Sequence, residues 1–402
     1  MTSIPASASG PLAGVRVIEL GQLIAGPFCG KTLGDFGAEV IKIEPPGKGD
    51  PLRKWRMLKN GNSVWWEVQS RNKQSVTLDL TQPEGQDILR ALVKEADVLI
   101  ENFRPGKMEE WGLGYEDLKK LNPRLVMARI SGYGQDGPYR DRPGFGIIAE
   151  SMGGLRYLTA EPGRVPVRVG VSIGDTLAAL HGVIGILMAL YHRDARGGVG
   201  QVIDIALYES VFNCMESLLP EYSAFNAVRE AAGSALPGIV PSNAYPCRDG
   251  WILIGGNGDG IFKRLMKAIG RDDLGTAPDL ASNDGRVKRV ADIDGAITAW
   301  TQARDKAEAL KILDDDDVPS GAIYSIADIA ADAQYRAREM ILNITTRDGY
   351  QVDVPGIVPK LSATPGGIRN TAPRLGEDTE AVLKRAGVKP ETIADLRAKG
   401  VI

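Results

Sequence analysis

The chain has 402 residues, of which 43% are hydrophobic and 25% charged, and this ordinary globular composition predicts two or three domains. A net charge of -3 gives no basic surface for nucleic acid or an anionic membrane, so we expect neither as a partner. The three widely spaced cysteines, Cys29, Cys214 and Cys247, argue against a disulfide framework and a zinc site. The first ten residues lack a basic start and an apolar stretch, so we expect no secretory signal and a cytoplasmic protein.

The first half of the chain predicts an α/β fold with a mostly parallel sheet. The short apolar runs "VRVIEL" and "AEVIKIEPP" flank a stretch compatible with a helix, "AGPFCGKTLGDFG", and together they form a βαβ unit. Further strands are expected at 96–103, 125–131 and 201–207, with helical patterns between them. The longest apolar run, Leu177 to Tyr191, is shorter than the roughly 18–20 residues of a membrane span, and we interpret it as a buried core helix.

A change in composition near Glu221, towards polar and small residues, predicts a domain boundary. We assign residues 1–222 to a large Rossmann-like domain and residues 223–330 to a smaller α+β domain. Residues 331–402 then form a C-terminal segment that ends in two short amphipathic helices.

Two sequence patterns resemble catalytic motifs. "GYGQDG", 132–137, has dinucleotide-binding spacing and follows a strand, but "PYRDRPG" comes next and cannot open the required helix, so we expect a turn. "GVSIG", 170–174, has the nucleophile-elbow spacing of serine hydrolases. A Ser172 hydrolase would need a histidine well after the serine, whereas the only two histidines, His181 and His192, lie within the helix that begins there. We expect one histidine to be a packed core residue and the other to be a cation in the last turn of the helix, where the helix dipole favours positive charge.

Asp175 stands at the mouth of this apolar helix and has two readings. "SIGD" fits a capping box, with Ser172 as N-cap and Asp175 satisfying free backbone donors. Alternatively, Asp175 is a catalytic nucleophile, because an ionised carboxylate needs no general base at neutral pH. The glycine-rich "GGNGDG", 255–260, is either a ligand-binding loop or a mobile hairpin tip.

The motifs together resemble the class III CoA-transferases, a family that includes formyl-CoA transferase, carnitine CoA-transferase and the α-methylacyl-CoA racemases. The stretches that carry the resemblance span nearly the whole chain and keep the family's order. They are "PLAGVRVIELGQLIAGPFCGKTLGDFGAEVIKIEPPGKGD", "SRNKQSVTLDL", "DVLIENFRPGKMEEWGLGYEDL", "ISGYGQDGP", "VGVSIGDTLAAL", "GGVGQVIDIALYESV" and "APRLGEDTEAVL".

The resemblance implies that Asp175 is the family's nucleophile. Its carboxylate would attack an acyl-CoA thioester to give an aspartyl anhydride, and then an aspartyl-CoA thioester that hands CoA to an acceptor acid. The developing oxyanions need amide donors, for which the turn before Asp175 and the glycine loop formed by Gly255, Gly256, Asn257 and Gly258 are candidates. CoA thioesters are then substrates, and no tightly bound cofactor or metal is expected.

The resemblance also places CoA contacts in the loops after the predicted strands. The implied positions are Ile24, Ala25, Leu78, Asp79, Asn102, Phe103, Arg104, Ser131, Gly132, Tyr133 and Gly134. Pro45 departs from the family pattern, which has a basic residue there, so Arg104, Lys107 and Arg71 become candidates for contacting the CoA phosphates. The family fold further implies a C-terminal segment returning to the large domain and an interlocked homodimer.

We therefore expect a CoA-transferase, a transferase of sulfur-containing groups, acting on an acyl-CoA and a carboxylic acid. Arg142 and Arg168 would suit a second carboxylate, which favours dicarboxylic acids, with succinyl-CoA as donor and a malate-like or citramalate-like acceptor. The alternatives are a racemase or epimerase of the same family, a Ser172 hydrolase and a non-catalytic binding module. The family's racemases carry a His-Asp pair where this chain has Phe145 and Gly146, neither of which can transfer a proton.

Overall fold

The computed structural model describes residues 10–402, and the centre of its first unit is a six-stranded sheet. The strand order is β5-β2-β1-β6-β7-β8, and every neighbouring pair is parallel. The strands are β1 (Arg16–Glu19), β2 (Glu39–Glu44), β5 (Lys73–Thr77), β6 (Val98–Glu101), β7 (Val126–Ser131) and β8 (Val202–Ala206). The α/β prediction is confirmed, because the short apolar runs form strands covered by helices.

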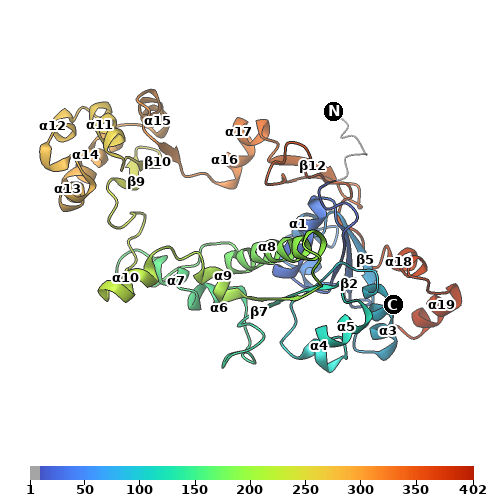
Figure 1. Cartoon of the computed structure of the whole chain (residues 1–402). Coiled ribbons are helices and arrows are strands. Elements are labelled where there is room, and N and C mark those ends of the chain that lie inside the picture. The colour runs from blue at the N-terminus through green and yellow to red at the C-terminus, as the bar shows by residue number, and fades with distance from the viewer. Residues whose placement is uncertain (1–9) are drawn as a thin grey trace. The chain divides into compact units, whose positions relative to one another are not determined.

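Helices cover the sheet and enclose its core. α1 (Ala25–Asp35) and α8 (Ile173–Ala195) pack on each other, and α8 also contacts β7 (Figure 1). A hydrophobic core cluster is formed by side chains of the strands and of five further helices. These helices are α3 (Pro83–Val93), α4 (Lys107–Glu110), α5 (Tyr115–Leu121), α18 (Thr379–Arg385) and α19 (Pro390–Ala398).

α8 is longer and less buried than its sequence predicts. The helix has 23 residues, and its most apolar 18-residue window has a mean hydropathy of 1.8, so by length and composition alone it could cross a membrane. Only 39% of that window is buried, which corrects the expectation of a buried core helix. Its contacts with α1, β7 and β8 make it part of the α/β unit.

The C-terminal segment belongs to the first unit. β12 (Ile341–Thr345) and β13 (Gln351–Pro355) form a hairpin, and α18 packs beside β5. Thr77 donates its N–H to the Thr379 hydroxyl at 2.9 Å, and Asp79 donates its N–H to the Val401 carbonyl at 2.8 Å.

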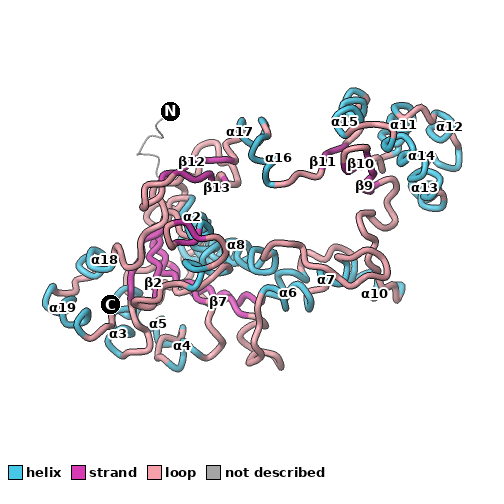
Figure 2. Tube along the Cα trace, turned by 180° about the vertical axis from the view of Figure 1, so that it is seen from behind, coloured by secondary structure: helices cyan, strands magenta, loops and turns pink. Residues whose placement is uncertain are grey.

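The second unit comprises Tyr157–Arg168 and Val228–Tyr335. Its antiparallel strands β9 (Ser242–Cys247), β10 (Gly250–Gly255) and β11 (Ser320–Ala322) pack with the surrounding helices around their own core (Figure 2). Those helices are α11 (Asp259–Ala268), α12 (Asp272–Gly275), α13 (Asn283–Lys288), α14 (Val290–Gln302) and α15 (Lys306–Asp315). The unit boundaries after 227 and 335 lie five residues beyond those expected from sequence, and 157–168, which we had assigned to the large domain, falls in the second unit.

α2 (Val64–Gln69) buries an acidic side chain that favours its neutral form. Glu67 is 4% exposed, and its Oε2 has no hydrogen-bond partner among the described residues. Burial, together with the nearby charge of Asp348, raises the pKa of Glu67 to about 7. Because the folded pKa lies above the unfolded value, Glu67 stabilises the fold most below about pH 4.5, and this contribution is lost as the pH rises to about 7.

We predict that the free energy of unfolding of Glu67→Gln, compared with that of the wild type, is more favourable at pH 8 than at pH 5. The expected difference is about 1–2 kcal/mol, because one pKa unit corresponds to ~1.4 kcal/mol and partial hydration reduces the full effect. Urea unfolding at both pH values measures it, with the exposed Glu116→Gln as control. Parallel pH profiles for the Glu67→Gln variant and the wild type would contradict the prediction.

Candidate active site

A cavity of about 430 Å³ opens at the carboxyl edge of the parallel sheet. Three of the predicted CoA-contacting residues, Leu78, Asp79 and Phe103, line it. Gln22 and Lys48, which the sequence did not single out, line it as well. The loops after β1, β2, β5 and β6 therefore meet where an open α/β sheet binds its ligands.

Asp79 shapes the entrance of α3. Its carboxylate accepts hydrogen bonds from the Thr81 hydroxyl at 2.6 Å, the Thr81 N–H at 2.9 Å and Gln82 at 3.0 Å. The bond from the Thr81 hydroxyl is the main cause that lowers the pKa of Asp79, so the side chain is a fixed negative charge at the cavity wall.

Phe103 is fixed by both its backbone and its ring. Its N–H donates to the Glu101 carboxylate at 2.8 Å, and its ring meets that of Trp111 edge-on at 5.4 Å between centroids. Burial raises the pKa of Glu101 to about 7, although Arg129 at 2.8 Å favours the charged form. The next residue, Arg104, is exposed beside the cavity loops.

The Ser131–Gly134 segment forms the turn expected from sequence. The Ser131 hydroxyl accepts the Gly134 N–H at 2.9 Å, and Gly134 has a φ of +91°. A Cβ on Gly132 would lie 2.9 Å from the Cα of Gly144, so only glycine fits before Tyr133 at this point of the turn. The next described helix is α6 (Gly146–Met152), too late to form a dinucleotide fingerprint.

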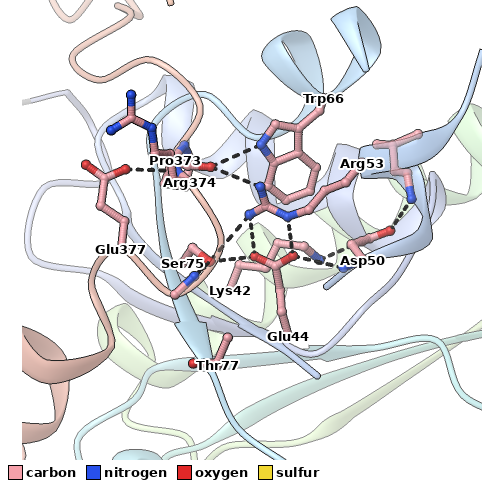
Figure 3. A network of polar contacts seen from close by, with 12 residues as sticks. Lys42, Glu44, Asp50, Arg53, Trp66, Ser75, Thr77, Pro373, Arg374 and Glu377 are labelled. Atoms are coloured by element: carbon pink, nitrogen blue, oxygen red, sulfur yellow. Dashed lines mark hydrogen bonds and ion pairs between the residues drawn. The ribbon is translucent and has the colours of Figure 1, made fainter. Parts of the chain in front are cut away.

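The first loop passes over buried charges before it enters α1 at Ile24 and Ala25, which are both buried. Asn102 holds this loop, because its side-chain amide accepts the Gln22 N–H at 2.8 Å and donates to the Gln22 carbonyl at 2.9 Å. Beneath the loop, the Lys42 ammonium lies 2.9 Å from Asp50 (Figure 3).

Lys42 and Asp50 favour each other's charged form under this loop. Lys42 also pairs with Glu19 at 3.0 Å. Burial alone would lower the pKa of Lys42, but Asp50 and Glu19 outweigh it and raise that pKa. Burial likewise opposes ionisation of Asp50, yet Lys42 lowers the Asp50 pKa.

Asp175 lies half-buried in the first turn of α8, against the backbone of α6. A Cβ built on Gly146 would lie 2.7 Å from Asp175 Cγ, and one built on Gly174 would lie 2.9 Å from the Gly146 carbonyl oxygen. These two glycines let the helices approach until the carboxylate touches backbone. The sequence did not predict this contact between Gly146 and Asp175, because the two residues lie far apart in the chain.

The capping-box reading of Ser172 is not met. Ser172 occupies the N-cap position, but its side chain makes no capping hydrogen bond to the described helix. The complete, reciprocal capping box is therefore not formed.

The histidines are engaged away from Ser172. Nδ1 of His181 lies 2.9 Å from the Leu177 carbonyl, and its Nε2 lies 3.2 Å from Asn213. His181 is only partly buried, which corrects the expectation of a core histidine, and His192 lies exposed in the last turn of α8. This arrangement gives a Ser172 hydrolase no histidine base.

One proposed phosphate contact is wrong. The Arg71 guanidinium is 1% exposed and makes a bidentate pair with Asp35 at 2.6 and 2.9 Å, so it cannot reach a ligand. Lys107 pairs with Glu110 at 2.9 Å but remains partly exposed. Lys48, three residues after Pro45, is exposed at the cavity and replaces Arg71 as a candidate.

The glycine loop belongs to the second unit, whereas Asp175 belongs to the first. Gly255 and Gly256 donate their N–H groups to Pro319 and Pro241, both at 2.9 Å, and the Asn257 carbonyl accepts from Arg286 at 2.7 Å. The loop is thus a pinned connection into α11 at Gly258, not a hairpin tip.

The glycines of this loop do not serve a left-handed backbone conformation. Gly255, Gly256 and Gly258 all have ordinary φ values. Gly256 instead permits close packing, because a Cβ there would lie 2.5 Å from a methyl carbon of Leu265 and 3.1 Å from Pro241.

The two arginines considered for a second carboxylate also fall in different units. Arg142, in the first unit, is exposed and lies over the Tyr139 ring at 3.7 Å, and Arg168 is exposed in the second. Within residues 10–402, no three His, Cys, Asp or Glu side chains are grouped to hold a metal ion.

Comparison with known proteins identifies relatives along nearly the full length. The family model described as CoA-transferase family III matches residues 12–379. Succinyl-CoA--D-citramalate CoA-transferase from Chloroflexus aurantiacus is 48% identical over 395 residues, which cover 98% of each chain. Succinate--glutarate CoA-transferase from Agrobacterium fabrum is 34% identical, covering 95% of this chain and 97% of its own.

A solved structure has the same fold. The crystal structure of a CAIB/BAIF family protein from Brucella suis superposes with a TM-score of 0.82 at 35% identity, covering 95% of this chain and all of the other.

Proposed function

Since the chain belongs to CoA-transferase family III and is a CoA-transferase, we propose that it moves CoA from succinyl-CoA to a second dicarboxylic acid, with Asp175 as covalent nucleophile. The observation that carries the nucleophile assignment is the half-buried Asp175 carboxylate held against Gly146 at the mouth of α8. The substrate class follows from relatives whose names pair succinyl-CoA or succinate with citramalate or glutarate.

In the first half-reaction, a carboxylate oxygen of Asp175 attacks the thioester carbonyl carbon, the C–S bond breaks, and CoA leaves as thiolate. The thiolate then attacks the aspartyl carbonyl of the mixed anhydride, releasing succinate and leaving an aspartyl-CoA thioester. An acceptor carboxylate attacks the carbonyl of this thioester, which releases the CoA thiolate and forms a second mixed anhydride with Asp175. The thiolate then attacks the acceptor's carbonyl carbon in that anhydride, which gives the new acyl-CoA and restores the Asp175 carboxylate. A carboxylate nucleophile suits this site because no step requires a general base.

The carboxyl-edge cavity would hold CoA. Phe103 and Leu78 supply apolar walls, and Lys48 with Arg104 supplies exposed positive charge for phosphate groups. That the glycine loop from Gly255 to Gly258 excludes water during the reaction, as an easily hydrolysed anhydride requires, stays a prediction from the family resemblance. We propose that the reaction uses CoA thioesters as substrates and needs no tightly bound cofactor. We also propose that it takes place in the cytoplasm.

We propose that the protein acts as a homodimer, interlocked as in the family fold. An apolar stripe runs along α8 with a period of three to four residues and stays exposed in the single chain. Its members are Leu180, Ile184, Leu187, Met188 and Tyr191. Sedimentation equilibrium is expected to give the mass of two chains, whereas a monomer at micromolar concentration would contradict the proposal.

We predict that Asp175→Asn and Asp175→Ala abolish CoA transfer, lowering kcat by at least about 10³-fold, because an amide or methyl group cannot form the anhydride. Succinyl-CoA and an acceptor acid, with CoA products followed by mass spectrometry, give the measurement. Ser172→Ala is the matched control and should keep substantial activity, since the hydroxyl makes no helix cap and has no histidine base. Near-normal turnover of the Asn variant would refute covalent catalysis by Asp175.

We predict that Gly146→Ala lowers transfer about 10²-fold or more, because its methyl group would overlap the Asp175 carboxylate and displace it by an ångström or so. Gly295→Ala is the control, since a Cβ there meets nothing within 4 Å. Full activity of Gly146→Ala would show that this contact does not position the nucleophile.

Gly146 also holds no transferable proton, which favours CoA transfer over racemisation.

A further inference from the structure

We propose that Asp50 is a positioning residue whose carboxylate holds the turn at Gln22 and Leu23 in the shape that forms the wall of the CoA cavity. The inference rests on the proposed function, because it concerns how the same cavity keeps its form. Gln22 lines the cavity, whereas Asp50 is 1% exposed and acts from behind it.

The turn has a backbone conformation that it would not keep unaided. Leu23 has a φ of +63°, in the left-handed region that branched side chains rarely adopt. Such a conformation persists only where the surroundings over-determine it.

Three side chains hold three successive residues of this turn. The Lys42 ammonium donates to the Gly21 carbonyl at 2.7 Å. Asn102 bonds both the N–H and the carbonyl of Gln22. The Leu23 N–H donates to the two Asp50 oxygens at 3.1 and 3.2 Å, so Asp50 holds the strained residue itself.

Asp50 is in turn fixed by groups outside the turn. It pairs with Lys42 of β2 and donates its own N–H to Glu44 at 2.9 Å (Figure 3). Its carboxylate also accepts the Leu52 N–H at 2.8 Å. Because Lys42 and Glu44 both belong to β2, the position of the carboxylate is set by the sheet. The geometry of β2 is thereby transmitted to the cavity wall.

The loop has no room to shift as a whole. A Cβ on Gly21 would lie 2.8 Å from the Cα of Gly26, so the chain before the turn is pressed against the first turn of α1. When Leu23 loses its acceptor, relaxation to negative φ must therefore swing Gln22 out of the wall.

The test is the affinity for free CoA, measured by calorimetry on the full-length protein. Asp50→Ala should raise the Kd for CoA about tenfold or more, as expected when a binding loop loses its preorganised shape. Asp35→Ala is the matched control, because it removes another buried carboxylate, the partner of Arg71 at the far end of α1. It should lower Tm comparably and leave the Kd within about twofold.

A double-mutant cycle separates positioning from general destabilisation. Glycine adopts positive φ without strain, so in a Leu23→Gly background the effect of Asp50→Ala should shrink to about threefold or less. If Asp50→Ala does not fold, Leu23→Pro tests the same turn, because proline lacks the N–H and cannot take this φ. It should raise the Kd about tenfold or more.

An unchanged Kd in Asp50→Ala or Leu23→Pro, or an equal effect of Asp50→Ala in both backgrounds, would overturn the inference alone. A wild-type protein that binds no CoA would overturn the proposed function with it.

Discussion

The carboxyl edge of the sheet depends on one buried set of charges, in which Lys42 and Lys73 face Glu19 and Asp50. Glu19 pairs with Lys42 at 3.0 Å and with Lys73 at 2.7 Å, and all four side chains are almost fully buried. Each buried ion costs several kcal/mol unless it is paired, so these charges persist only as a set. They come from β1, β2, β5 and the loop after β2, and Glu19 and Lys42 are register partners, so a slip of one residue would bury unpaired charge.

A second buried pair extends this constraint to the C-terminal segment. Arg53 binds Glu44 with two hydrogen bonds, at 2.7 and 2.8 Å, and its guanidinium lies 3.7 Å from the centre of the Trp66 ring. Arg53 and Trp66 both donate to the Pro373 carbonyl at 3.2 Å, as Figure 3 shows. Residues more than 300 positions apart thus share one polar network, which anchors the returning chain beside β5 and next to the cavity.

The sequence predicted what local periodicity records and missed what depends on distant partners. The strands of the parallel sheet follow from apolar runs, and the loops after them contain Leu78, Asp79 and Phe103, which line the cavity. Arg71 was misjudged because charge suggests exposure, whereas its partner Asp35 lies 36 residues earlier and is buried with it. Lys48 and Gln22 carry no distinguishing pattern, and only the meeting of four loops brings them into one cavity.

The surroundings of the proposed nucleophile, Asp175, also depend on a distant partner that the sequence does not reveal. The sequence named Asp175 as a candidate nucleophile, but it could not show that the carboxylate is confined by Gly146 from another helix. A nucleophile that needs no base depends on placement more than on a proton-accepting neighbour. The close crossing of α6 and α8 at Gly146 and Gly174 provides that placement, because backbone atoms cannot rotate away as a side chain could. Two glycines without functional groups therefore determine where the proposed chemistry takes place.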